Sequence, residues 1–219
     1  PIVVEGNDFN VGLFTRDAEL VTAGIGSLVH VTTMGDALSS IIDGGESIED
    51  GDIFMTNDPF LGALHQNDVV VASPLFRNED IFMWIGNVLH HPDVGGCDAG
   101  SFCINARTLE DDPPRFFMKI VDRGEVVVEN EQAFVNNSRL PDAVALDLRA
   151  QIGAINVTRD RLNDLLDERG EGLVADVMSR SIDLAERQVR DFVHRLPDGE
   201  WTGEAYMDGV RVGDERICR

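Results

Sequence analysis

The chain has 219 residues, of which 43% are hydrophobic, so it can bury a sizeable core in one or two domains. Its formal net charge is −22, from 40 acidic and 18 basic side chains, and Lys119 is the only lysine. A surface this negative would repel nucleic acids and anionic membranes, and no apolar run approaches the length of a membrane span.

The first third of the chain is predicted to be β-rich with one helix. Residues 11–14 and 19–22 flank a polar turn and are typical of a hairpin. A short helix is expected at 34–42, followed by two glycines, and a strand at 52–56. That strand leads into a turn at Asp58, whose carboxylate most simply accepts a hydrogen bond from its own backbone, with a catalytic role as the alternative.

A second hairpin is expected in the middle of the chain. Residues 68–76 and 81–89 are strand-like, and the four polar residues between them form a loop of ordinary hairpin length. Folding at this loop brings Asp68, at the start of one strand, close to His90, just after the other. His65 lies three residues before Asp68, after a glycine that permits a turn toward the same point.

The register of this hairpin decides whether the three side chains meet. A symmetric four-residue loop pairs Asp68 with Leu89 and leaves His90 on the other face, whereas a three- or five-residue loop, or a bulge, aligns Asp68 with His90. Imidazole and carboxylate suit Zn, Fe or Mn, so an aligned register predicts a metal site, with hydrogen-bonded histidines as the alternative. The spacing H-x-x-D is one residue longer than is usual in 2-His-1-carboxylate oxygenases, which argues against that class.

Residues 92–115 are rich in Gly, Asp and Pro and predict a long loop, a feature that is often functional in a compact domain. Cys97 and Cys103 lie in this loop, and Cys218 makes the number of cysteines odd, with no C-x-x-C pair. The pattern argues against a disulfide scaffold and favours a reducing cytoplasm. Asp98 should raise the thiol pKa of Cys97, which disfavours that residue as a nucleophile.

From residue 141 the apolar spacing becomes helical. Two amphipathic helices with a short glycine-containing link are expected over 141–166 and 174–193, and they predict an α-hairpin whose apolar stripes pack in the core. A further strand region is expected from 199 to 208.

These elements indicate an α+β fold in three regions: a β-rich metal-site region at 1–136, the helical hairpin at 137–198, and the start of another β region at 199–219. The chain begins with Pro1 rather than Met, so we expect it to be part of a larger subunit. It has no P-loop, G-x-G-x-x-G or G-x-S-x-G motif, and therefore lacks the usual phosphate-binding loops.

Four blocks, in order along the chain, resemble the hydantoinase B family. Residues 51–69 fit the pattern G-D-x-x-x-x-N-D-P-[aromatic]-x-G-x-x-H-x-x-D-V. The other blocks are HHPDVGG at 90–96, a helical block at 144–152, and LPDG at 196–199. The similarity runs over essentially the whole chain. Because members of this family are longer, the chain resembles their N-terminal part.

The resemblance implies a metal and an ATP-using partner. The family joins lactam-opening enzymes (N-methylhydantoinase, 5-oxoprolinase, caprolactamase) to carboxylases of acetone or acetophenone. In both branches a hydantoinase A-like subunit or domain uses ATP to activate a carbonyl oxygen. In acetone-carboxylase-like members a metal is held at the positions that here are His65, Asp68 and His90, and the ion expected here is Mn, Zn or Fe. His91 and Asp93 are then expected to orient the ligands, with Asp58 as a third candidate.

Less specific features indicate whether the chain resembles the carboxylases or the lactam-opening enzymes of this family. Residues 100–103 and 138–149 look more like the carboxylases, whereas the doublet His90-His91 looks more like the hydantoinases. We therefore expect a subunit of an ATP-dependent, metal-containing ketone carboxylase complex, which carboxylates an activated, enol-type intermediate. An ATP-dependent hydrolase of a lactam or cyclic amide is one alternative, and a non-catalytic structural subunit is another.

The expected partners are an ATP-binding hydantoinase A-like subunit, a small ketone or lactam, and bicarbonate if the complex is a carboxylase. The expected setting is a cytoplasmic hetero-oligomer without nucleic acid or membrane. An acidic surface predicts that assembly depends on salt, because like charges must be screened before subunits approach. A high-salt cytoplasm would favour such a surface, and a GC-rich genome that replaces Lys by Arg is the other explanation.

Overall fold

The computed structural model describes residues 6–207 and 216–218. The chain forms two compact units, residues 1–182 and 183–219, and the boundary falls within helix α5 (Glu171–His194). The first unit contains the sheet and every residue that the sequence predicts for the site.

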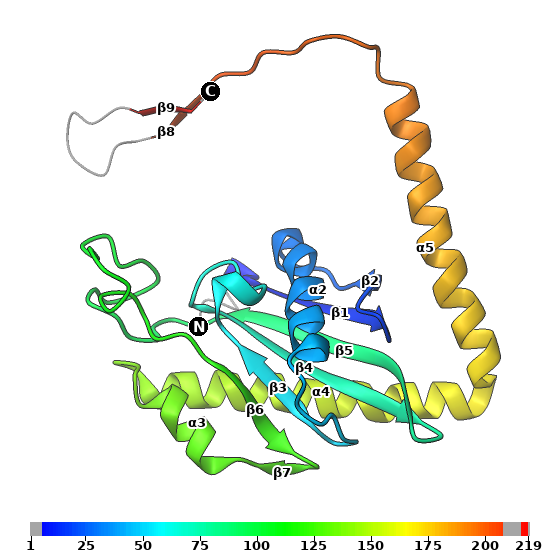
Figure 1. The fold of residues 1–219 in the computed structure, drawn as a ribbon, viewed down its shortest axis with the longest axis horizontal. Coiled ribbons are helices and arrows are strands. Elements are labelled where there is room, and N and C mark those ends of the chain that lie inside the picture. Colours follow the sequence, from blue (N-terminus) through cyan, green and yellow to red (C-terminus); the bar gives the residue numbers. More distant parts are fainter. Residues whose placement is uncertain (1–5, 208–215, 219) are drawn as a thin grey trace. The chain divides into compact units, whose positions relative to one another are not determined.

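A seven-stranded antiparallel sheet forms the centre of the first unit, with the strand order β2-β1-β5-β4-β3-β6-β7 (Figure 1). Both predicted hairpins are present, as β1–β2 and β4–β5. The strands are β1 (Phe9–Thr15), β2 (Leu20–Ala23), β3 (Ile53–Thr56), β4 (Asp68–Arg77), β5 (Asp80–His90), β6 (Phe117–Asp122) and β7 (Glu125–Val126).

The β4–β5 hairpin has the register that aligns Asp68 with His90. Its turn is shorter than the predicted loop and consists of Asn78 and Glu79, both at positive φ, as in two-residue hairpin turns. A symmetric pairing from this turn would still place Asp68 opposite the residue before His90. A bulge at Phe82 of β5 adds one residue and corrects the register, which is the third of the three predicted solutions.

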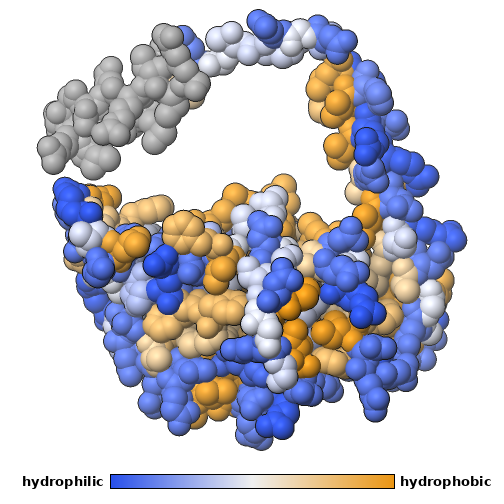
Figure 2. All heavy atoms as spheres, in the orientation of Figure 1, coloured by the Kyte–Doolittle hydropathy of each residue, from blue (hydrophilic) through white to orange (hydrophobic). Residues whose placement is uncertain are grey.

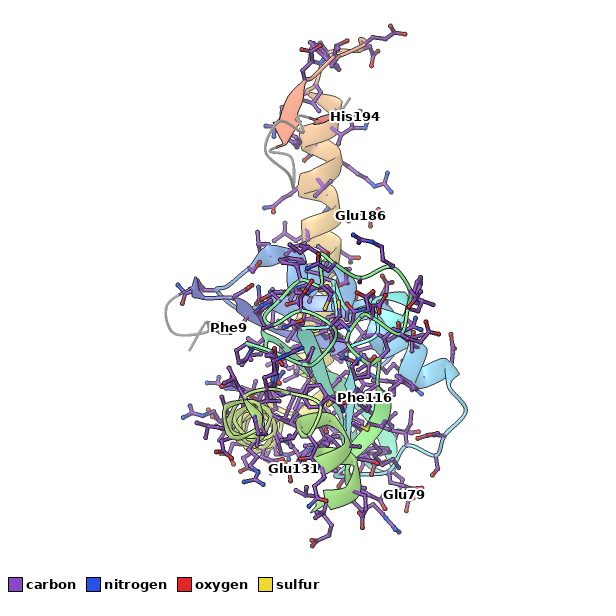
Figure 3. The ribbon with its side chains drawn as sticks, turned by 90° about the vertical axis from the view of Figure 1, so that its left-hand side faces the viewer. Phe9, Glu79, Phe116, Glu131, Glu186 and His194 are labelled. Carbon is purple, nitrogen blue, oxygen red and sulfur yellow. The ribbon has the colours of Figure 1, made fainter. Side chains whose placement is uncertain are left out.

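Helices cover both faces of the sheet, as Figure 3 shows in a view along α4. Helix α2 (Leu28–Asp43) packs on one face, where the core includes Phe14, Met34, Leu38 and Trp84. Helices α3 (Val128–Val135) and α4 (Pro141–Arg169) cover the other face, where the core includes Met83, Ile85, Leu148 and Ile155. Because side chains alternate along a strand, neighbouring residues of β5 serve different cores.

Two helices differ from the sequence prediction. Helix α2 begins at Leu28, six residues before the predicted start at 34. Its first turns contain β-branched residues, which are weak helix formers, so packing of His30 and Val31 against the sheet outweighs local propensity. Helix α3 occupies a stretch in which no helix was predicted, because its eight residues make only about two turns, too few to display a helical period.

The two long helices are present as α4 and α5, which confirms an α+β fold with helices after the sheet. Their antiparallel packing stays a prediction. A single residue, Gly170, separates them, and this link is shorter than those that join antiparallel helix pairs. Met178 is the buried residue of α5, and apolar side chains such as Leu173 and Val177 are exposed. Figure 2 shows hydrophobic residues, in orange, on the surface of this helix.

The second unit contains a two-stranded sheet of β8 (Ala205–Met207) and β9 (Arg216–Cys218). The strand predicted over 199–208 thus begins at residue 205, and residue 208 lies outside the described residues. The three-region division stays a prediction. None of the helices in the described part of the chain is both long and apolar enough to cross a membrane.

Candidate metal centre

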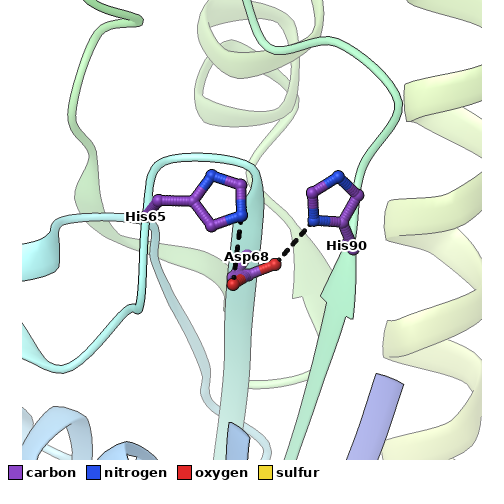
Figure 4. Close-up of side chains that lie close together, drawn as sticks. All are labelled: His65, Asp68 and His90. Atoms are coloured by element: carbon purple, nitrogen blue, oxygen red, sulfur yellow. Dashed lines mark hydrogen bonds and ion pairs between the residues drawn. The ribbon is translucent and has the colours of Figure 1, made fainter. Parts of the chain in front are cut away.

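His65, Asp68 and His90 meet at one end of the sheet (Figure 4). Asp68 is the first residue of β4, and His90 is the last residue of β5, directly across the hairpin. The carboxylate of Asp68 lies between the two rings. Its Oδ2 is 3.3 Å from His65 Nε2, and its Oδ1 is 2.8 Å from His90 Nδ1.

The turn that carries His65 depends on Asp58 and Gly62. Asp58 caps the short 3-10 helix η1 (Pro59–Leu61), since its Oδ1 accepts a hydrogen bond from the Phe60 amide at 2.9 Å. This contact is the structural role that the sequence offered for Asp58. Gly62 has φ +108°, and a side chain there would overlap the backbone of α2 at Ala37, so glycine lets the turn lie against that helix.

The chemistry of the cluster fits a divalent metal. One ligand atom from each of His65, Asp68 and His90 lies within 4.8 Å of the others, a spread that small side-chain rotations would bring within reach of one ion with bonds of about 2.1 Å. Burial alone would raise the pKa of Asp68, but hydrogen bonds from His65 and His90 outweigh it and hold that pKa well below its usual range. The carboxylate is therefore ionised and ready to bind a cation.

Asp8 and His30, which no sequence pattern singled out, border the same cluster. Asp8 precedes β1, and its Oδ2 is 3.6 Å from His90 Nδ1. His30, in the first turn of α2, has its Nε2 2.8 Å from Asp8 Oδ1 and its Nδ1 3.8 Å from Asp68 Oδ2. The His30 ring is 2% exposed, and its Nδ1 has no hydrogen-bond partner within the described structure. A cation beside Asp68 would satisfy this nitrogen.

Only weak signals pointed to these two residues. Asp8 reaches the centre because β1 pairs with β5. These two strands are far apart in the sequence, and no local pattern predicts that they pair. His30 is a single histidine on an amphipathic helix, where a buried, satisfied histidine is the ordinary case.

Ser101 holds His90 from the side opposite Asp68. The Oγ of Ser101 is 2.7 Å from His90 Nε2, while His90 Nδ1 faces the carboxylate. Asp93 stabilises the loop that carries Ser101, because it accepts hydrogen bonds from two loop amides and from the backbone and guanidinium of Arg139. In the described contacts Asp93 does not touch the three ligands, so it acts on the centre only through this loop.

His91 lies on the other face of the sheet from His90. Its Nε2 is 2.9 Å from Gln151 Oε1, and the Gln151 amide donates to Val69 O and Asn87 Oδ1, each at 2.9 Å. Burial lowers the pKa of His91 to about 4, so the ring is neutral. His91 therefore belongs to a polar network between the sheet and α4, and the structure does not bring it to the predicted ligands.

Cys97 and Cys103 are free thiols in the loop after β5. Burial, followed by the charge of Asp98, raises the pKa of the Cys97 thiol, in the direction expected from the sequence.

A seven-stranded α+β unit with a histidine–carboxylate cluster at the end of its central hairpin defines the class of this protein. Residues 1–218 match the model of the Hydantoinase B/oxoprolinase family. The chain belongs to this family.

Three similar proteins illustrate the family's range. The delta subunit of acetophenone carboxylase from Aromatoleum aromaticum is 25% identical over 218 residues, covering 96% of this chain and 32% of that subunit. The 5-oxoprolinase of Dictyostelium discoideum is 27% identical over 197 residues, covering 89% of this chain and 16% of that enzyme. The crystal structure of ATP-dependent caprolactamase from Pseudomonas jessenii has a TM-score of 0.84 at 25% identity, covering 92% of this chain and 35% of that one. The chain spans between 16% and 36% of the length of the curated relatives it matches.

Proposed function

We propose that this chain supplies the metal centre of an ATP-dependent enzyme complex that acts on the carbonyl group of a small molecule. The observation that supports this most is the cluster of His65, Asp68 and His90 in a chain of this family. A divalent ion held there (Mn, Zn or Fe) would serve as a Lewis acid toward a carbonyl or phosphoryl oxygen.

The residues around the ion have separate tasks. Asp68 offsets part of the ion's charge in a buried site, and His90 is fixed by the hydroxyl of Ser101. Asp8 and His30 close the α2 side of the centre. His65 is the most exposed ligand, at 23%, so substrate reaches the ion past this ring.

Of the two branches, we favour a ketone carboxylase. This choice is supported by the match to the acetophenone carboxylase subunit along 96% of the chain and by the carboxylase-like residues 100–103 and 138–149. ATP would be used by a hydantoinase A-like partner, because the sequence has no phosphate-binding loop of its own, and bicarbonate would be the second substrate. The fold match to caprolactamase keeps lactam hydrolysis as the alternative. We place the complex in the cytoplasm, where ATP is available.

Metal analysis of the purified protein tests the centre. We expect bound metal in the parent protein, loss of most of it in His65→Ala, and retention in His194→Ala, which removes an exposed histidine of α5. Equal metal content in all three proteins would refute the assignment.

The two branches separate in the reconstituted complex. With ATP, a ketone and labelled bicarbonate, a carboxylase fixes the label, whereas a lactam hydrolase opens a lactam without bicarbonate. Ring opening without label fixation would refute the carboxylase proposal.

A structural role for the metal is tested by removing it. If chelation leaves the circular dichroism spectrum unchanged and abolishes activity of the complex, the ion is catalytic. Full activity of the metal-free complex would instead identify a non-catalytic subunit.

A further inference from the structure

A small pocket opens beside the metal centre, on the side of His65. Its volume is about 260 Å³, slightly below the range of about 300–1,000 Å³ that is usual for small-molecule pockets. It is therefore sized for a molecule with few non-hydrogen atoms. The lining consists of a metal-site histidine, part of the loop that holds His90, and neighbouring residues: His65, Gln66, Ser101–Ile104, Asp112 and Pro113.

One wall of the pocket is apolar and unusually exposed. The Phe102 ring stacks on His65, with centroids 5.0 Å apart and planes 13° from parallel, yet Phe102 remains 69% exposed. Ile104 is 64% exposed. Two large apolar side chains left in water next to a polar centre are typical of a surface that a ligand covers.

The charge of the pocket disfavours anions. Among its described lining residues there is no Lys or Arg, and Asp112 is acidic. The nearby guanidinium groups have partners of their own: Arg139 binds Asp93, Arg107 binds the backbone carbonyls of Ile104 and Ala106, and Arg115 lies over the Phe60 ring. The charge of a divalent ion would itself be offset by the two carboxylates beside it, Asp68 and Asp8.

We propose that this pocket binds an uncharged carbonyl compound, with an apolar group of the ligand against Phe102 and Ile104, and that it rejects ligands bearing a carboxylate. The amide of Gln66 and the hydroxyl of Ser101 are the polar groups that the lining offers to the ligand. The inference rests on the proposed function, since it names the substrate class of the same centre. It favours simple ketones and unsubstituted lactams over acidic lactams such as 5-oxoproline.

Ligand NMR on the Mn²⁺-loaded protein tests this proposal without catalysis. A ligand beside Mn²⁺ has its proton signals broadened, and the concentration dependence gives its affinity. We expect broadening of acetophenone and caprolactam and at least tenfold weaker binding of 5-oxoproline. Phe102→Ala should weaken binding of the neutral ligands about tenfold, because it removes the ring that they cover. Phe60→Ala, which removes an exposed ring outside the pocket, is the matched control and should change nothing.

A charge substitution supplies the converse test. Ile104→Arg places a cation in the wall and should strengthen binding of 5-oxoproline at least fivefold while weakening that of acetophenone. Electron paramagnetic resonance of Mn²⁺ in each variant verifies that the ion is still held.

The outcomes separate this inference from the proposed function. If the parent protein binds neither Mn²⁺ nor another divalent ion, the proposed function fails. If the ion is bound but no ligand is broadened, or 5-oxoproline is broadened as strongly as acetophenone, or Phe102→Ala has no effect, the pocket assignment is overturned and the metal centre stands.

Discussion

Replacing Ser101 by alanine tests how the metal centre is held in shape. The Oγ of Ser101 lies 2.7 Å from His90 Nε2, while His90 Nδ1 faces Asp68. Without a metal, His90 Nδ1–H donates to Asp68 and Nε2 accepts from the Ser101 hydroxyl. A metal bound at Nδ1 would require the other tautomer, in which Nε2–H donates to the Ser101 hydroxyl and Nδ1 carries the lone pair, so Ser101 would stabilise the metal-binding form of His90. Ser101→Ala removes this stabilisation and leaves a largely buried N–H of the metal-binding form without a partner.

The size of the effect follows from the surroundings of His90. An N–H that loses its partner in a buried position costs about 1–3 kcal/mol, or roughly 5- to 150-fold in affinity. Ser101 also lines the open pocket, so a water molecule can take the place of the hydroxyl and restore one hydrogen bond. We therefore expect metal affinity to fall about tenfold. Ser101→Thr keeps a hydroxyl and should stay within about threefold of the parent protein.

Competition with a chromophoric chelator measures the affinity, and ¹⁵N-edited NMR of the His90 ring reports its tautomer. Equal metal affinity and an unchanged His90 tautomer in Ser101→Ala would refute this reasoning.

The order Ser101–His90–Asp68 is also that of nucleophile, base and acid in serine hydrolases. Labelling of Ser101 by a fluorophosphonate in the metal-free protein would favour that chemistry over the positioning role.

Three further changes have defined outcomes. His30→Ala should lower metal affinity about tenfold by calorimetry, since it removes the buried nitrogen facing the centre, and an unchanged affinity would contradict its role. Gln151→Leu should destabilise the protein by about 3 kcal/mol in urea, because three buried partners lose their hydrogen bonds, whereas exposed Gln132→Leu should change stability by less than about 0.5 kcal/mol. Gly62→Ala should cost about 2 kcal/mol or more through overlap with α2, while Gly153→Ala, in an open position of α4, should stabilise by about 0.5–1 kcal/mol. Comparable unfolding midpoints for the two glycine variants would show that the turn tolerates a side chain.

The central hairpin shows how far the sequence could specify this site. Continuous apolar runs of strand length on both sides of a polar loop were enough to predict the two strands and the approach of Asp68 to His90. The register was not readable, because it depends on one extra residue at Phe82 and on a two-residue turn in which Glu79 adopts a positive φ that its side chain disfavours. Such local strain is compensated by tertiary contacts, which a single sequence does not display.

His91 lies away from the predicted metal ligands for a different reason. His90 and His91 are adjacent in sequence, and the resemblance to a family block suggested one shared role. The strand's period of two separates them, so His90 points to the α2 face and His91 to the α4 face. The reverse holds for Asp8 and His30, which are remote in sequence from the hairpin yet lie at its end, because β1 and α2 pack beside β5.

The arrangement of the candidate centre leaves one side open, which under the proposed function is the side from which substrate would approach. Helix α2 closes one side through the buried ring of His30, and the sheet with its polar network under α4 closes another. The side chains of Asp68 and His90 are 3% and 7% exposed, against 23% for His65. Access therefore lies along His65, under Phe102. Under the proposed function, a partner that passes on an activated substrate would deliver it over this loop, so substitutions at Phe102 should alter substrate use, whereas substitutions on the outer face of α4 should not.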